Sequence, residues 1–352
     1  MLLTPTGSVA WLAGGNGSFA NATRCEQSYL PSKFVDASIG GIGAQTITAG
    51  ADAAAKSLSL GSAPGSAGRP TLALQNRAVL SVSGLFTVQG SGTLAGDGTV
   101  AGSVVNLGTV LPTNLTVAGS FTNQGLVAGS GVLNAAVVNG RTGQLRSGAG
   151  DLLFVNGTSH SNAGVIDIRG GGEQQYSGAL GNTANGRILL NDAVLRLNNG
   201  ITNAGQVQLS FGGATVYGSM ATTTGGKVIL SGNSQTTFFD AVTVDSGGEL
   251  RVSNGLTGVF FGQVTQRTGA LFTGTGTKFY EGGLAIGSSP GLGVDAGSVN
   301  FGVGNLYVAE IGGITACTAA CETNAFLREM PSCATAASTS TSLPATWPSA
   351  AR

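Results

Sequence analysis

The sequence predicts an all-β chain that folds as a single right-handed parallel β-helix of about 12 coils. Three observations predict this fold. A phrase of small polar residues, a glycine and an aliphatic residue recurs at a nearly constant interval, and the segments between its copies alternate polar with aliphatic residues. Glycine is abundant, with 60 residues, while charged residues make up only 9% of the chain. A turn about every 20 residues, followed by short strands, is typical of a solenoid.

The recurring phrase sets the period of the solenoid. Its marker glycines are Gly108, Gly125, Gly143, Gly164, Gly186, Gly205, Gly226, Gly248 and Gly269. The intervals between them are 17, 18, 21, 22, 19, 21, 22 and 21 residues. Asparagine precedes several of these glycines, and both residue types tolerate a positive φ. We therefore interpret each phrase as a tight turn that leads into a strand.

The segments that follow the turns have the period of a strand. Val194–Leu197 and Leu250–Val252, for example, alternate aliphatic with polar residues, as strands with one buried face should. At about 4.8 Å per coil, about 12 coils predict a rod roughly 60 Å long. Its dry aliphatic interior supplies most of the stability.

Composition excludes several classes of protein. A hydrophobic fraction of 41% argues against disorder, which needs low hydrophobicity and high charge. Sixteen basic and sixteen acidic residues cancel, so no electrostatic footprint for nucleic acid exists. The four lysines, Lys33, Lys56, Lys227 and Lys278, are too scattered to form a patch for anionic lipid.

The chain divides into three parts. Residues 1–35 hold Trp11, Phe19, Tyr29 and Phe34, and are predicted to form a cap that closes the end of the solenoid. Residues 36–313 carry the strand pattern and form the predicted β-helix. Residues 314–352 are of low complexity, and we expect them to be disordered or to be an out-of-frame tail.

The ends of the chain carry no clear targeting or metal signal. The N-terminal apolar stretch has no preceding basic residue and is interrupted by Pro5 and Gly7, so no signal peptide is predicted. No apolar run is long enough for a transmembrane helix. Cys25 stands alone, whereas Cys317, Cys321 and Cys333 crowd the tail and either form a local disulfide or stay unpaired. A zinc site is disfavoured because four ligands are needed and His160 is the only histidine.

Three segments together resemble the β-helical passenger modules of bacterial surface proteins, which include autotransporter-type adhesins and surface proteins with C-terminal sorting signals. The segments are Trp11–Phe19, the repeated phrases, and the Ser-Pro-Gly turn at Ser289–Gly291 with the strand-like Leu306–Gly313. The resemblance implies an extracellular or cell-surface location. The sequence departs from the family pattern at Arg24-Cys25, where a further tryptophan is usual, and at Arg77, where glycine is usual. The loss of periodicity after Gly313 suggests a frame-shifted or truncated reading frame.

A few residues are candidates for chemistry. Measured from the preceding marker glycine, Asp151 at +8 and Glu173 at +9 come nearest to the same coil position, so they form a candidate carboxylate pair for glycan cleavage. The alternative is that both acids are solvated at loop edges. His160 lacks the partners of a triad and is expected to be an exposed turn residue.

Three further patterns invite functional readings. Asp97, in Gly96–Val100, lacks the tandem repetition of a calcium loop and is expected in a turn. Gly170–Glu173 lacks the Lys-Ser/Thr pair of a phosphate loop and is expected to be a flexible loop. The C-terminal third is rich in aromatic residues, which are expected mostly inside the coil; if several face outward, they form a stripe for carbohydrate stacking or partner binding. These residues are Phe238, Phe239, Phe260, Phe261, Phe272, Phe279 and Tyr280.

The sequence thus favours a non-catalytic extracellular stalk or adhesin-like passenger of a bacterial surface protein, with no catalytic, metal or cofactor-binding residue and no cofactor. The expected partners are glycans or surface proteins, together with further copies of the chain stacked end to end, but not nucleic acid. A membrane would be reached only through a missing anchor. Two alternatives stay open: a β-helical polysaccharide lyase or hydrolase, and a fragment of a larger autotransporter.

Overall fold

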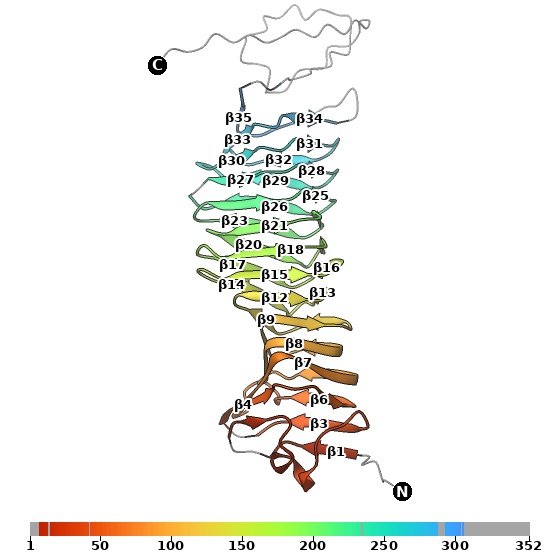
Figure 1. Ribbon diagram of the computed structural model, residues 1–352. Helices are drawn as coiled ribbons and strands as arrows, with labels where there is room; N and C mark the ends of the chain where they lie inside the picture. Colours follow the sequence, from red (N-terminus) through yellow and green to blue (C-terminus); the bar gives the residue numbers. More distant parts are fainter. Residues whose placement is uncertain are drawn as a thin grey trace, which may run out of the picture.

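A computed structural model of the chain describes residues 7–12, 15–41, 43–233, 235–287, 293–303 and 305. It is an all-β parallel β-solenoid of about 12 turns with an irregular N-terminal β region, which confirms the predicted fold class. The coils stack along one axis into a rod, with β1 near one end and β35 near the other (Figure 1). Every strand-to-strand pairing is parallel and joins a strand to its counterpart one coil away, as in β14 with β17.

Three strands separated by corners make up a typical coil, so the solenoid has three faces. We call them the first, second and third face, in the order in which β10, β11 and β12 form them. The short strands of the first face are β1 (Gly7–Ala10), β3 (Val35–Ile39), β6 (Ser57–Leu60), β10 (Phe121–Asn123), β13 (Val137–Asn139), β16 (Ser159–Asn162), β19 (Ala179–Asn182), β22 (Ile201–Asn203), β25 (Met220–Thr222), β28 (Val242–Val244), β31 (Val264–Gln266) and β34 (Leu284–Ile286).

The other two faces are built in the same way. The second face contains β2 (Gly17–Ser18), β4 (Gly43–Ala49), β11 (Leu126–Ala128), β14 (Gln144–Ser147), β17 (Val165–Arg169), β20 (Arg187–Asn191), β23 (Gln206–Ser210), β26 (Lys227–Ser231), β29 (Glu249–Val252) and β32 (Leu271–Thr273). The third face contains β5 (Ala53–Ala55), β12 (Gly131–Asn134), β15 (Leu152–Asn156), β18 (Glu173–Tyr176), β21 (Val194–Leu197), β24 (Ala214–Tyr217), β27 (Thr236–Phe238), β30 (Thr257–Phe260), β33 (Thr277–Tyr280) and β35 (Ser298–Phe301).

Three longer strands pass around the corners instead of stopping at them. They are β7 (Gly68–Val88), β8 (Thr93–Asn106) and β9 (Thr109–Val117). In β7 the pairing with β8 shifts between Leu74 and Ala78, where the chain turns from the second to the third face. Asn76 and Arg77 lie at this corner with φ of 54° and 57°, a left-handed conformation that favours glycine. Arg77 thus occupies a site where glycine would be less strained.

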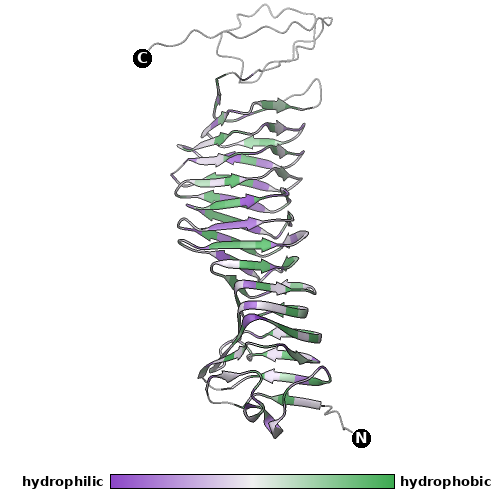
Figure 2. Cartoon of the chain, viewed as in Figure 1, coloured by the Kyte–Doolittle hydropathy of each residue, from purple (hydrophilic) through white to green (hydrophobic). Residues whose placement is uncertain are grey.

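An unbroken aliphatic column fills the interior along the second face. Each member lies in register with the one a coil below, and all are buried. The column runs through Ile47, Leu72, Leu94, Val110, Val127, Leu145, Ile166, Ile188, Val207, Val228, Leu250 and Phe272. Burial of each such side chain contributes about 1.5–3 kcal/mol. Figure 2 shows hydrophobic residues on strands from one end of the rod to the other, interspersed with hydrophilic ones.

The first face carries a polar column instead, which we call the asparagine ladder. It consists of Asn106, Asn123, Asn139, Asn162, Asn182 and Asn203, all buried and in register on successive coils. Each Nδ2 donates to the Oδ1 of the next asparagine at 2.7–2.8 Å. The spare amide proton reaches a backbone carbonyl, such as Leu126 O from Asn106. Because buried amides are costly unless paired, this bonding is what lets asparagine occupy the interior.

The repeated phrase does not require glycine for the reason expected from the sequence, which was a positive φ at the turn. Among the nine marker glycines only Gly269 has a positive φ, of 82°. At Gly125, Gly164 and most other marker positions, a Cβ atom would lie well inside contact distance of a carbonyl oxygen from the coil below. The marker glycines are thus required by the close approach of stacked corners.

The N-terminal region is tied to the first coils. β1 pairs with β3, Trp11 forms an antiparallel bridge with Cys25, and two 3-10 turns follow at η1 (Ala22–Arg24) and η2 (Glu26–Ser28). Trp11, Phe19 and Cys25 are buried in the same core as the coils, and burial raises the pKa of the Cys25 thiol. The Ser289–Gly291 turn, the Leu306–Gly313 strand, the three C-terminal cysteines and the tail 314–352 lie outside the described residues, and the boundaries at 35 and 313 remain predictions.

Substituting Gly125 tests whether corner spacing requires glycine. We expect Gly125→Ala to lower the free energy of unfolding by about 1–3 kcal/mol or more, because its Cβ would press on Gly108 O. Gly213→Ala is the matched control, since a Cβ there meets nothing within 4 Å and its φ is not positive. Urea unfolding followed by circular dichroism measures both. Equal midpoints for the two variants would contradict the spacing argument.

Candidate functional site

The predicted carboxylate pair lies on adjacent coils of the third face, but both acids are engaged. Glu173 N donates to Asp151 O at 2.9 Å, so the two residues are neighbours through the backbone. Asp151 accepts from Gly148 N at 2.8 Å and from Ser130 Oγ at 3.1 Å, which closes the turn before β15. Glu173 pairs with Arg196 at 2.5 Å. The arrangement therefore uses each carboxylate in a bond that ties coils or closes a turn.

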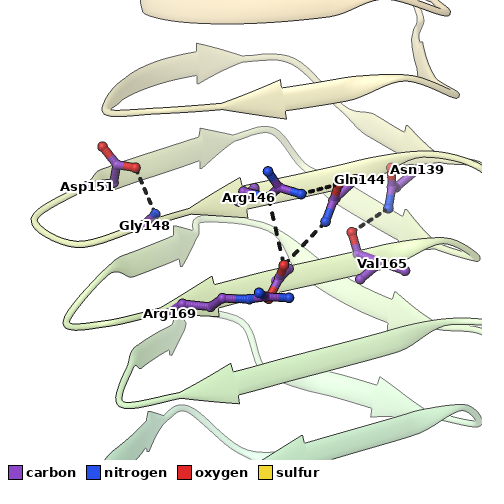
Figure 3. A network of polar contacts seen from close by, with 8 residues as sticks. Asn139, Gln144, Arg146, Gly148, Asp151, Val165 and Arg169 are labelled. Carbon is purple, nitrogen blue, oxygen red and sulfur yellow. Dashed lines mark hydrogen bonds and ion pairs between the residues drawn. The ribbon is translucent and has the colours of Figure 1, made fainter.

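A denser polar network surrounds Asp167 on the outside of the second face. Figure 3 labels three of its members, Gln144, Arg146 and Arg169. Asp167 is only 1% exposed because the side chains of Gln144, Arg146 and Arg169 cover it. Its carboxylate lies 2.6 Å from Arg169 Nε and 3.8 Å from Arg146 Nε, and accepts from Gln144 Nε2 at 3.3 Å. The arrangement neutralises one buried charge with two arginines and leaves no oxygen exposed for a substrate.

The sequence held a usable signal for this network. Arg146 and Asp167 each lie three residues after a marker glycine, Gly143 and Gly164, so they occupy the same position on consecutive coils. The other outer ion pairs also join residues of neighbouring coils: Lys56–Asp36, Arg196–Glu173, Lys227–Glu249 and Arg267–Asp245. The charged side chains of these pairs thus act as inter-coil ties.

The expectation that His160 is an exposed turn residue is wrong. His160 lies in β16 with its ring in the interior of the solenoid, 5% exposed. Its Nδ1 accepts from Val137 N at 3.3 Å, and its ring meets that of Tyr176 edge-to-face with centroids 5.5 Å apart. Loss of hydration on burial lowers the pKa of His160 to about 4. Its position is explained by register, since the alternation in β16 places His160 and Asn162 inside and Ser161 outside.

The two glycine-rich candidates are parts of the coil. Asp97 lies within β8, opposite Asn114 of β9 at the register shift where the strand rounds a corner; it is in a strand and not in the expected turn. Gly170 and Gly171 form a turn with φ of 56° and 84°, and their N–H groups donate to Asn191 O and Asp192 O on the next coil. Within the described residues, no three histidine, cysteine or acidic side chains gather as a metal site would require.

Four of the seven aromatic residues singled out from the sequence are internal. Phe238, Phe260 and Tyr280 stack along the third face with centroids 5.1 and 5.5 Å apart, and Phe301 continues the stack at 5.8 Å. Phe272 ends the aliphatic column of the second face. These rings fill the upper coils, where the aliphatic side chains give way to larger ones.

A second row of aromatic rings lies on the outside, beside the third face. We call it the outer stripe: Tyr217, Phe239 and Phe261, with Arg196 at its lower end. The ring centroids are 4.6 and 5.1 Å apart, the ring planes are within 13° of parallel, and the Arg196 guanidinium lies 4.1 Å from the centroid of Tyr217. Phe239 and Phe261 remain 40% and 48% exposed.

The stacking of the outer stripe limits what it can bind. A pyranose packs against the face of an aromatic ring, but both faces of Phe239 are covered by Tyr217 and Phe261. Arg196 covers the remaining face of Tyr217. Tyr217 and Phe239 therefore offer mainly ring edges to solvent, whereas Phe261, at the upper end, has only one face stacked on a ring of the stripe.

Two of the depressions on the described surface have a lining that bears on function. One is lined by small and polar residues of the first face around Gly200 and Met220, and the other lies at the corner around Gly186 and Gly205. The second has two cations, Arg187 and Lys227, on its rim. Neither is lined by a carboxylate or a histidine.

Comparison of the chain with family models, with curated proteins and with solved structures found no match. The two short 3-10 turns are the helical segments of the described residues, and no described helix is long and apolar enough to cross a membrane. The geometry therefore carries the functional argument alone.

The buried imidazole predicts a specific pH dependence of stability. The pKa of His160 is lowered to about 4 in the folded chain, against about 6.5 when unfolded. As the pH falls below 6.5, His160 is protonated in the unfolded chain but not in the folded chain, so the free energy of unfolding decreases until about pH 4. Between pH 7 and pH 5 the loss from this group should be about 2 kcal/mol.

Urea unfolding at pH 7 and pH 5 measures this loss, and His160→Gln, which does not titrate, should remove most of it. Because the chain has one histidine, the difference between the two proteins is assigned without ambiguity. An equal loss in both would show that His160 is not the group responsible.

Proposed function

We propose that the chain is a rigid, non-catalytic stalk or adhesin-like passenger of an extracellular bacterial surface protein. The observation that carries the proposal is the continuity of the interior columns. The aliphatic column of the second face runs from Ile47 to Phe272, and the asparagine ladder spans six successive coils of the first face. Surface location and bacterial origin are carried by the resemblance of the sequence alone.

Stiffness follows from the direction of the bonds. In a β-solenoid the backbone hydrogen bonds run along the axis, so bending or stretching the rod strains many of them at once. The asparagine ladder adds side-chain bonds in the same direction. Ion pairs such as Lys227–Glu249 and Arg267–Asp245 add ties between coils on the outside. A rod built this way acts as a spacer that holds whatever is attached to one end at a fixed distance from the other.

The glycan-cleaving alternative is less well supported. General acid–base cleavage needs two carboxylates free to face one substrate bond. Asp151 closes a turn through Gly148 N and Ser130 Oγ, and Glu173 is held by Arg196. Neither surface depression is lined by a carboxylate. The geometry thus favours the scaffold over the enzyme.

An activity assay separates the two functions. We expect no new reducing ends or unsaturated products when the purified chain is incubated with pectin, alginate and related anionic glycans. The variant to compare is Asp151→Ala, with Asp240→Ala as its match, because the Asp240 carboxylate is also engaged by a backbone N–H: its Oδ2 accepts from Gly218 N of the neighbouring coil at 2.7 Å. Rapid depolymerisation that is lost in Asp151→Ala and kept in Asp240→Ala would overturn the proposal.

A further inference from the structure

A lysine is fully buried inside the upper coils, which is rare for this residue type. Lys278 is the second residue of β33, and the alternation in this strand points Lys278 and Tyr280 into the interior. Its exposure is 0%. The residue in register one coil below is Gly258, which leaves room for the long side chain.

Asp295 meets this lysine from the next coil. It lies beside Phe272 of the second face, one coil above, and its side chain is 8% exposed. Lys278 Nζ is 2.6 Å from Asp295 Oδ1 and donates to Ala296 O at 2.5 Å. Tyr280 Oη donates to the other carboxylate oxygen, Asp295 Oδ2, at 2.8 Å.

This pair differs from every other ion pair of the described residues. In the others the basic side chain is 37–60% exposed, so water solvates the cation even where the acid is as buried as Asp167. Removing two charges from water costs about as much as their attraction returns, so burial of this pair gives little net stability. Burial does, however, hold in contact the two groups that an amide condensation joins, away from solvent.

We propose that Lys278 and Asp295 form an intramolecular amide bond. A proton first passes from the Lys278 ammonium to Asp295 Oδ1, which leaves an amine and a carboxylic acid. The Nζ lone pair then attacks Cγ, and a C–N bond forms while the Cγ–Oδ1 bond breaks. Oδ1 takes a second proton from Nζ and leaves as water. One ammonium and one carboxylate thus become one amide and one water molecule. The reaction consumes no oxidant and no cofactor.

The surrounding groups fit this reaction. Oδ2 becomes the amide oxygen and carries negative charge in the tetrahedral intermediate, and the Tyr280 hydroxyl is already placed to stabilise that charge. Burial and the neighbouring Asp295 carboxylate raise the pKa of Tyr280 well above its usual value, so the hydroxyl stays a donor. Ala296 O accepts a hydrogen from Nζ and so holds the amine beside the Asp295 carboxylate.

The bond would fasten the last described coils to one another. It would close a loop from β33 through β34 to the segment before β35. The inference stands independently of the proposed function, because it rests on three buried side chains alone.

Peptide mapping of the purified full-length chain tests the amide. The intact mass should be lower than the sequence mass by one water molecule. Trypsin should fail to cleave after Lys278, since acylated lysine is not a substrate, and should release residues 268–328 as one peptide that lacks one water. Cleavage after glutamate should then leave residues 268–281 and 282–310 joined as a branched peptide. A folded wild-type chain with its full sequence mass and normal cleavage after Lys278 would overturn the proposal.

Variants assign the bond to this pair. Asp295→Ala should restore the full mass of its own sequence, whereas Lys227→Met, which removes the exposed Lys227–Glu249 pair, should keep the loss of water. Tyr280→Phe retains the ring stack and should slow bond formation, seen as a lower crosslinked fraction over a time course. Retention of the water loss in Asp295→Ala would exclude Asp295, and an unchanged rate in Tyr280→Phe would exclude a role for the hydroxyl. The peptide map of the wild-type chain alone shows whether the amide forms, so the proposal can be tested even if a variant fails to fold.

Discussion

The structure depends on one constraint: each residue of a coil lies directly above its counterpart in the coil below, at the spacing of paired strands. Side chains in the interior therefore stack on side chains of the same kind. Aliphatic side chains stack on the second face from Ile47 to Phe272, and amides stack on the first face from Asn106 to Asn203. Asparagine suits such a column because its amide offers both a donor and an acceptor, so an unlimited series can bond along the axis. The same constraint brings backbone corners so close together that most of the marker glycines cannot carry a Cβ.

The outer surface obeys this constraint as well, which bears on function. Charges of opposite sign stack on consecutive coils, as in Arg146 on Asp167 and Lys227 on Glu249. The rings of the outer stripe stack on one another, which covers both faces of Phe239. Groups that an enzyme would direct at a substrate are here directed at the neighbouring coil, which is the physical basis for regarding the chain as a scaffold.

Much of the fold could be predicted from the sequence because the residue pattern of a solenoid repeats once per coil. The glycine intervals and the strand alternation were sufficient for the parallel coils. The position within the coil was harder to predict, because a shift of one residue exchanges inside for outside. In the repeated phrase Ala184-Asn185-Gly186, for example, Asn185 is exposed. The residue of the asparagine ladder on this coil is Asn182, three positions earlier. His160 was assigned to the surface for the same reason, and the meeting of Lys278 with Asp295 depends on a segment whose path no periodicity specifies.

The central claim is that the buried asparagines hold coil to coil, and Asn162→Ala tests it most directly. The substitution leaves Asn139 Nδ2 and Asn182 Oδ1 without their ladder partners, whereas Asn185→Ala changes an exposed asparagine a few residues away. Hydrogen exchange combined with urea unfolding measures both variants. The account predicts that Asn162→Ala loses about 2–5 kcal/mol and that amide protection falls on the adjoining coils, with Asn185→Ala close to wild type. Indistinguishable stability and protection in the two variants would contradict it.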